Sequence, residues 1–309
     1  MPEIQTKNNT TKVLKMPYFT ERKKESLTGY LYISPFFILF TIFSIFPIFF
    51  SFYLAFHRWN GLGEMQYVGW RNFKLILDDP MFWKSISNTF IMALMGTLPQ
   101  LIVAFLLAYA LNSSIVRFKN FFRISIFMPN VTSIVAVAIV FGTIYTNSET
   151  GIMNVVLSYF NISPINWGSN EWGLKVAIST MVFWRWVGYN TIIYLAGMQS
   201  IPNELYEAAK IDGASLWQQI RYITLPLMKP VIIFTVFVST IGSLQLFTEP
   251  LVFLGRTMRE EGITMVLYLY REAFMNNAFG TASASAVILF FIIIIISVIN
   301  LLVANRLGK

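Results

Sequence analysis

The chain has 309 residues, of which 56% are hydrophobic, 17% aromatic and only 12% Asp, Glu, Lys or Arg. Soluble domains carry about 25% charged residues, so this composition favours an integral membrane protein over a soluble enzyme. The formal net charge of +8 does not indicate a nucleic-acid partner, because the bases lie mostly between apolar runs, as topology signals do. The absence of cysteine excludes disulfides and thiolate metal sites.

Long apolar windows are the dominant feature of the chain. A membrane-spanning helix needs about 20 mostly apolar residues. Windows with at most one charged residue predict six such helices, near residues 30–55, 88–111, 124–145, 174–199, 230–254 and 282–304. Pro47, Pro99 and Pro129 lie inside or at the ends of these windows, where membrane helices tolerate proline as a kink. The predicted fold class is an all-α integral membrane protein with six transmembrane helices.

The distribution of Lys and Arg predicts the orientation. These residues gather in a basic N-terminal tail, residues 1–28, and in the C-terminal end, residues 306–309. They also gather in the polar segment between the second and third windows and in the one between the fourth and fifth windows. Because cytosolic loops are enriched in them, we expect both termini in the cytosol, on either side of a six-helix membrane domain, residues 29–305. The first outer loop is the weak point, since it holds four bases, Arg58, Arg71, Lys74 and Lys84.

A polar segment, 204-ELYEAAKIDGASLWQQIRYITLPLMKP-230, separates the fourth window from the fifth and is too polar to span lipid. We interpret it as two short amphipathic helices. The first has Asn203 as its N-cap and ends at Gly213, a typical left-handed position. The second starts with a capping box at Ser215 and is stopped by Pro226. Their apolar faces need cover, either by the protein's own helix ends or by a partner.

The residues in this segment resemble the EAA loop of ABC-importer permeases. The stretches that carry the resemblance are Glu207-Ala208-Ala209, Asp212-Gly213-Ala214 and Ile223-Thr224-Leu225-Pro226. Other stretches resemble the maltose-type, carbohydrate-importing branch of that family: Asn88-Thr89, Phe122-Arg123, Met128-Pro129, Ala196-Gly197-Met198 before Ile201-Pro202, and Ala282–Ala286. The resemblance implies the type I ABC-importer permease fold.

The resemblance also implies a coupling role for the loop at residues 200–229, which in that family inserts into a cleft on a separate cytosolic ATPase. The coupling positions it implies are Glu207, Ala208, Ala209, Asp212, Gly213, Leu225 and Pro226. It further implies a heterodimer with a second permease subunit, two copies of the ATPase subunit, an extracytoplasmic sugar-binding protein, and a place among the lipids of the cell membrane.

The sequence contains no G-x-x-x-x-G-K-[ST] phosphate loop, so we expect a transport subunit and not an enzyme. We expect no cofactor on this chain, with ATP and Mg²⁺ bound by the partner ATPase. The expected function is to form half of the pathway for a sugar, with di- or oligosaccharides as the leading class. The alternative is a stand-alone secondary transporter or channel for a small polar solute, which usually shows intramembrane acids and repeated helices.

Polar and aromatic residues in the fourth and fifth windows are candidates for substrate contact, because sugars bind to aromatic faces and a few hydrogen-bonding groups. They are Arg185, Trp186, Tyr189, Asn190, Ser243, Gln245 and Glu249. Interhelical packing is the alternative role of each. Arg185 lies near the predicted midplane, where an arginine lines a wet pathway or pairs with an acid. A pair with Glu249 would have to bridge a difference in depth, since Glu249 is predicted nearer the outer face.

Overall fold

The computed structural model describes residues 18–113, 116–255 and 258–307. Contacts divide the chain into two units, residues 1–51 and 52–309, and each is described by itself. Residues 1–17 of the predicted basic tail and residues 308–309 of the predicted C-terminal end lie outside the described residues.

The first unit is helical and contains a π-helical turn immediately before a proline. It comprises α1 (Tyr18–Phe40), the π turn η1 (Thr41–Ile45) and the start of α2 (Phe46–Leu54). Pro47 has no amide hydrogen to continue the α-helical bonding pattern. The turn is wider here, with the Phe46 amide donating to the Thr41 carbonyl. A π turn inserts one extra residue and so lets the helix run on past the proline.

The second unit begins with a short antiparallel pair of strands and continues as helices. Its elements are β1 (His57–Arg58), β2 (Gln66–Tyr67), α3 (Arg71–Leu77), α4 (Pro80–Asn112), α5 (Lys119–Val131), α6 (Ile134–Ile144), α7 (Ile152–Ser158), α8 (Glu171–Gln199), α9 (Asn203–Ile211), α10 (Leu216–Gln219), the π turn η2 (Ile220–Thr224), α11 (Leu225–Leu244), α12 (Thr248–Leu254), α13 (Met265–Tyr270), the π turn η4 (Arg271–Met275) and α14 (Phe279–Leu307).

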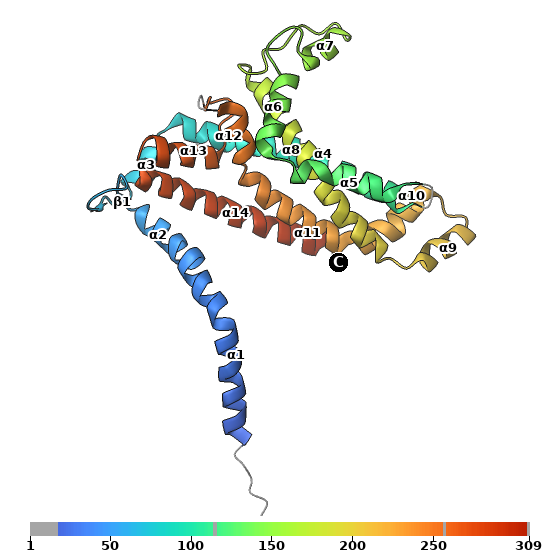
Figure 1. Ribbon diagram of the computed structural model, residues 1–309, viewed down its shortest axis with the longest axis horizontal. Helices are drawn as coiled ribbons and strands as arrows, with labels where there is room; N and C mark the ends of the chain where they lie inside the picture. The colour runs from blue at the N-terminus through green and yellow to red at the C-terminus, as the bar shows by residue number, and fades with distance from the viewer. Residues whose placement is uncertain (1–17, 114–115, 256–257, 308–309) are drawn as a thin grey trace, which may run out of the picture. The chain divides into compact units, whose positions relative to one another are not determined.

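Helices α4 and α8 form the central pair of this unit, and α5 packs against α8 (Figure 1). Glycine permits both approaches. A Cβ atom on Gly96 of α4 would lie 3.3 Å from the Ser179 carbonyl oxygen of α8. A Cβ atom on Gly188 of α8 would lie 2.6 Å from the carbonyl carbon of Ile126 in α5, and closer still to its oxygen. The backbones of α5 and α8 therefore touch at Gly188, with no room for a side chain.

Glu171 connects α4 and α8 at the start of α8. Its Oε1 accepts hydrogen bonds from Lys84 Nζ at 2.6 Å and from Lys175 Nζ at 2.7 Å. The hydrogen bonds from Lys175 and Lys84 lower the pKa of the Glu171 carboxyl to about 2. The Lys175 side chain is only 2% exposed, so this carboxylate supplies the partner that a buried ammonium needs.

Asn154 of α7 fixes the loop that leads into α8. Its side chain is buried, and its Nδ2 donates to the carbonyls of Ser148 at 2.9 Å, Ile165 at 3.1 Å and Thr146 at 3.4 Å. Its Oδ1 accepts from the Ile165 amide at 3.0 Å and from Trp167 Nε1 at 2.8 Å. One buried amide thus satisfies backbone groups from two separate parts of the loop.

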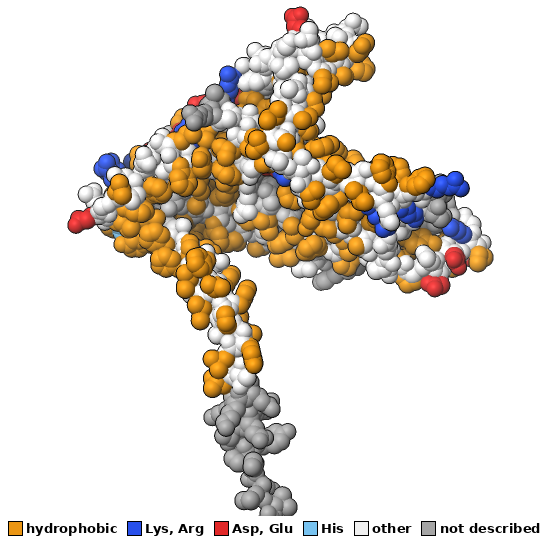
Figure 2. Space-filling view, viewed as in Figure 1, with side chains coloured by type: hydrophobic (Ala, Val, Ile, Leu, Met, Phe, Trp, Pro, Cys, Tyr) orange, Lys and Arg blue, Asp and Glu red, His pale blue; other side chains and the backbone are white. Residues whose placement is uncertain are grey.

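Four helical stretches among the described residues are long and apolar enough to cross a membrane: Ser26–Leu54, Pro80–Asn112, Leu216–Leu254 and Phe279–Arg306. Helices α5 and α6 would together make a fifth, bent by 94°. In the second unit, hydrophobic side chains cover much of the visible face of the central helices, while charged side chains gather toward the ends, including the end that carries α9 and α10 (Figure 2). This distribution suits a protein embedded in lipid.

The single helix predicted near residues 124–145 is two helices in the structure. The chain breaks at Thr132 and Ser133, between α5 and α6. The hydroxyl of Thr132 donates to the Met128 carbonyl at 2.8 Å, and its amide donates to the same oxygen at 3.1 Å. Threonine side chains compete in this way for helical carbonyls and favour helix ends.

Candidate functional site

One face of α8 carries three of the predicted pathway residues, Trp186, Tyr189 and Asn190. Residues three and four apart share a helix face, so their spacing in the sequence is enough to place them together. The rings of Trp186 and Tyr189 meet edge to face with centroids 5.7 Å apart, and both side chains are partly exposed. Asn190 is buried, and its Nδ2 donates to Ser239 Oγ of α11 at 3.4 Å. This face therefore offers aromatic surface beside amide and hydroxyl groups.

A second set of predicted residues lies where the fifth window departs from a single helix. The predicted continuous helix over 230–254 was wrong, because Gln245, Leu246 and Phe247 are not helical and separate α11 from α12. Pro250 explains the break: in an unbroken helix its ring would clash with the Leu246 carbonyl. Thr264 Oγ1 donates instead to that carbonyl at 2.7 Å. The freed backbone group is thus satisfied within the protein, as a membrane environment demands.

Arg185 and Glu249 form an ion pair across the gap between α8 and α12. Nη1 of Arg185 lies 2.6 Å from Oε1 of Glu249, and the two side chains are 13% and 7% exposed. The expected difference in depth does not separate them. That expectation assumed a helix that continues through Glu249, whereas the break at Gln245–Phe247 interrupts the rise of the helix before α12 begins. Glu249 also lies in the first turn of α12, where the helix dipole favours a carboxylate.

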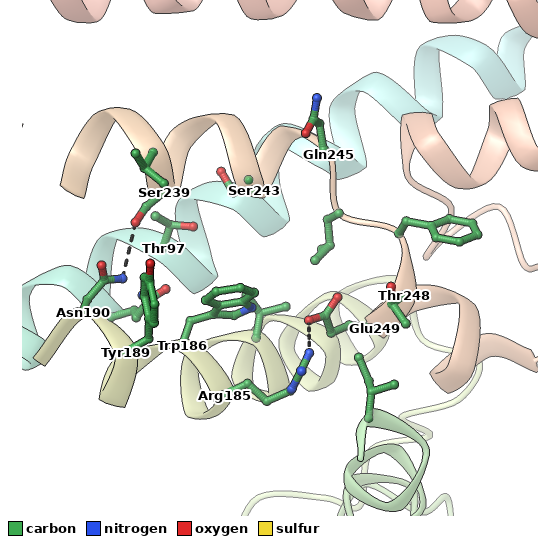
Figure 3. Close-up of a pocket in the computed structure, with 17 residues that line it drawn as sticks. Thr97, Arg185, Trp186, Tyr189, Asn190, Ser239, Ser243, Gln245, Thr248 and Glu249 are labelled. Carbon is green, nitrogen blue, oxygen red and sulfur yellow. Dashed lines mark hydrogen bonds and ion pairs between the residues drawn. The ribbon is translucent and has the colours of Figure 1, made fainter. Parts of the chain in front are cut away.

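These residues line one cavity of about 480 Å³ between α4, α8 and the α11–α12 segment (Figure 3). All seven predicted pathway residues belong to its lining: Arg185, Trp186, Tyr189, Asn190, Ser243, Gln245 and Glu249. The volume falls in the range of about 300–1,000 Å³ that is usual for small-molecule sites. The structure therefore brings the seven together, while their contact with substrate stays a prediction.

The sequence reasoning missed the polar residues that α4, α11 and α12 add to the cavity. They are Thr97, Gln100, Ser239 and Thr248. Thr97 and Gln100 are three apart on α4 and interrupt a long apolar window, which was the available signal. Gln100 is 2% exposed, and its Nε2 has no hydrogen-bond partner among the described residues. A buried amide that lacks a partner at a cavity wall is a donor available to a ligand.

The predicted coupling segment folds as two short helices around Gly213. The Gly213 amide donates to the Lys210 carbonyl at 3.1 Å and the Ala214 amide to the Ala209 carbonyl at 2.8 Å. Together with a φ of +76° at Gly213, this is a Schellman motif. An added Cβ atom would meet nothing within 4 Å, so the backbone angle and not crowding requires glycine. The predicted capping box between Ser215 and Gln218 is present.

Two local predictions in this segment were wrong. The N-cap of α9 is Pro202, and Asn203 is already its first helical residue, without a side-chain cap. Pro226 does not stop the second helix, because the π turn η2 precedes it and α11 continues through it. The Leu225 amide donates to the Ile220 carbonyl across this turn, which repeats the arrangement before Pro47.

The segment exposes apolar side chains beside the predicted coupling residues. Ile211 is 87% exposed, Tyr222 70% and Trp217 66%. Of the predicted coupling residues, Ala209 is half-buried and the others are exposed: Glu207, Ala208, Asp212, Gly213, Leu225 and Pro226. On the inner side, the Tyr206 hydroxyl contacts Thr224 Oγ1 at 2.9 Å. The protein's own helix ends therefore cover only part of the apolar faces of the two short helices. Ile211 is the most exposed of the apolar side chains that remain uncovered.

Comparison with known proteins assigns the chain to a family. Residues 75–309 match the model of the binding-protein-dependent transport system inner membrane component. The chain belongs to this family. The arabinooligosaccharide transport permease AraP of Halalkalibacterium halodurans is 34% identical, over 94% of this chain and 92% of its own length. The lactose transport permease LacF of Rhizobium radiobacter is also 34% identical, over 89% of this chain and 92% of its own length.

Solved structures of permeases share the fold. A chain of a bacterial ABC transporter for import of the acidic polysaccharide alginate superposes with a TM-score of 0.82 at 24% identity, over 95% of this permease and 100% of that chain. The same comparison with the transporter in complex with its alginate pentasaccharide-bound periplasmic protein gives a TM-score of 0.81. The resemblance to ABC-importer permeases read from the EAA loop is confirmed, and the chain is a membrane component of such an importer.

Proposed function

We propose that this permease forms one half of the transmembrane pathway for a di- or oligosaccharide. The observation that carries the proposal is the cavity between α4, α8 and α11–α12, which combines the Trp186 and Tyr189 rings with neutral amides and hydroxyls. Such a lining matches the apolar faces and hydroxyl groups of sugars. The relatives named for arabinooligosaccharide and lactose transport support the same substrate class.

The proposed topology has six spans and both termini in the cytosol. The spans are α1–α2, α4, the bent pair α5–α6, α8, the α11–α12 segment and α14. Helix α8 completes this set as an unbroken helix of 29 residues, although its composition is less apolar than that of the four long stretches. Because the sequence has no cysteine, single introduced cysteines report sidedness. Tyr159→Cys should react with a membrane-impermeant maleimide in intact cells, and Ile211→Cys only after permeabilisation.

The proposed assembly adds the second half of the pathway, the ATPase and the sugar-binding protein. A second permease would complete the pathway as a heterodimer, and two copies of a cytosolic subunit would bind ATP and Mg²⁺ and hydrolyse ATP. An extracytoplasmic sugar-binding protein would deliver the substrate at the cell membrane. The family description and the solved complex with a periplasmic protein support this arrangement.

Coupling would run through the α9–α10 segment. Its exposed residues Ile211 and Trp217 give it the apolar surface that a docking element needs, beside the charged Glu207 and Asp212. The Schellman motif at Gly213 and the capping box make the segment a pre-formed element that loses little freedom on binding.

Matched glycine variants test the proposal. Gly213 and Gly63 have φ values of +76° and +72°, and an added Cβ atom meets nothing within 4 Å at either position. Gly213→Asp and Gly63→Asp therefore impose the same chemical change and similar backbone strain at different places. We expect Gly213→Asp to lose ATPase retention and sugar uptake after co-expression with the partner subunits, and Gly63→Asp to keep both. Wild-type transport without any ATPase would instead favour the stand-alone carrier.

A further inference from the structure

The cavity contains one positive and one negative side chain among the described residues that line it, Arg185 and Glu249. The other polar residues of that lining carry amides, hydroxyls or an indole. The charge that a bound molecule meets is therefore decided by this pair.

The geometry of the pair makes its net charge close to zero. Nη1 of Arg185 and Oε1 of Glu249 are 2.6 Å apart, and both side chains are largely withdrawn from solvent. Buried charges are screened much less than exposed ones, so each strongly compensates the other. Figure 3 shows the Glu249 carboxylate directed at the Arg185 guanidinium, next to the Trp186 ring.

The two charges come from different elements, so the compensation is a property of the fold at this point. Arg185 projects from α8, and Glu249 from the first turn of α12, just after the break. A substrate carboxylate that approached Arg185 would meet a guanidinium whose charge the Glu249 carboxylate already compensates, although Arg185 Nε has no hydrogen-bond partner among the described residues. The second negative charge would have no partner of its own in the cavity, which is costly in a low-dielectric site.

We propose that Glu249 is a specificity-determining residue: by neutralising Arg185, it restricts the cavity to neutral saccharides and excludes those that carry uronate carboxylates. This rests on the proposed function and narrows its substrate class. The neighbour with a TM-score of 0.82 imports the acidic polysaccharide alginate. Since the fold is shared, any discrimination within the membrane pathway depends on its side chains, and this pair supplies the charges among the described residues of the cavity lining.

The test compares two probes that differ only at carbon 6 of each ring, α-1,4-linked galactobiose and digalacturonate. Binding of each is measured by equilibrium dialysis with the detergent-purified importer, without its binding protein. Wild type should prefer galactobiose by at least about tenfold, equivalent to roughly 1.4 kcal/mol. Glu249→Gln, which leaves Arg185 uncompensated, should shift the ratio toward digalacturonate by at least about tenfold.

A double variant separates charge selection from a purely structural role. Arg185→Gln with Glu249→Gln leaves the cavity neutral, so galactobiose binding should stay within about threefold of wild type and digalacturonate should remain the weaker ligand. Glu171→Gln is the matched control, since it makes the same substitution in an ion pair outside the cavity lining. It should leave the ratio of the two probes unchanged.

Four results would overturn the inference: equal binding of both probes to wild type, no binding of either, an unchanged ratio in Glu249→Gln, or loss of galactobiose binding in the double variant. If the importer with Glu249→Gln does not assemble, binding of the two probes to the double variant decides the outcome. ATP-driven uptake of neutral saccharides by the wild-type importer is measured in parallel. Failure of uptake refutes the proposed function itself, whereas uptake without charge discrimination refutes only the role of Glu249.

Discussion

Gly188→Ala should disrupt the packing of α5 on α8. The added Cβ atom would lie 2.6 Å from the Ile126 carbonyl carbon, so the two backbones must separate by at least about 0.8 Å to reach ordinary contact at 3.4 Å. Overpacking of this kind costs typically about 1–3 kcal/mol, and occasionally more where the obstacle is backbone. Alanine gains about 1 kcal/mol of helix propensity over glycine, which offsets part of the loss. The difference leaves a net destabilisation of up to about 2 kcal/mol.

Gly142→Ala in α6 is the matched control, because an added Cβ atom there meets nothing within 4 Å. It keeps the propensity gain without the clash, so it should be neutral or slightly stabilising. The assay is thermal unfolding of the two purified variants beside wild type, followed by loss of the monodisperse peak in size-exclusion chromatography. If Gly188→Ala melts at the same temperature as Gly142→Ala, the close approach of α5 and α8 is wrong.

Three further variants test the local structure. Asn154→Ala removes the side chain that holds the Thr146, Ser148 and Ile165 backbone groups, so the loop before α8 should be cut by protease at least about tenfold faster than in wild type. Thr264→Val removes the hydroxyl that satisfies the carbonyl freed by the α11–α12 break, and should lower thermal stability by about 1–3 kcal/mol. The pKa of Glu171 is lowered to about 2, so its stabilising contribution should be complete above about pH 4.5 and be lost as the pH falls toward 2. Glu171→Gln should remove that part of the acid dependence of the melting temperature.

Opposite outcomes would contradict these expectations. Protection of the Asn154→Ala loop equal to wild type would mean that water or other groups replace the amide. An unchanged Thr264→Val melting temperature would mean that the freed carbonyl does not need the hydroxyl. A Glu171→Gln variant with the same acid dependence as wild type would show that the Lys84 and Lys175 contacts do not set it.

Composition was enough to locate the long helices α4, α8 and α14 of the second unit, because long apolar windows in lipid have few alternatives to helix. Composition did not reveal the breaks at Thr132–Ser133 and at Gln245–Phe247, because hydropathy averaged over a window does not register the effect of a single residue. At the first break, the Thr132 hydroxyl competes for a helical carbonyl, and at the second, Pro250 has no amide hydrogen. Pro250 was a signal for the second break. Pro226 was expected to end a helix and does not, because a π turn before a proline lets the helix continue past it.

The candidate site could be predicted where helical periodicity applied. Trp186, Tyr189 and Asn190 share a face from their spacing alone, and the structure places them on one cavity wall. Gln100 was missed because the window that contains it was assessed only by its overall apolar composition, and not residue by residue. The ion pair of Arg185 and Glu249 depends on how α11 and α12 lie against α8, and no local pattern carries that information.

The central claim, that the α9–α10 segment docks on a cytosolic ATPase, is tested most directly by site-specific crosslinking. The chain has no cysteine, so Ile211→Cys places a single thiol on a side chain that is 87% exposed in the segment. Tyr159→Cys, at a position 80% exposed in the loop after α7, is the control. With a short bifunctional thiol–amine reagent on membranes containing the importer, we expect Ile211→Cys to form an adduct with the ATPase subunit and Tyr159→Cys to form none. An ATPase adduct from Tyr159→Cys alone would contradict the account.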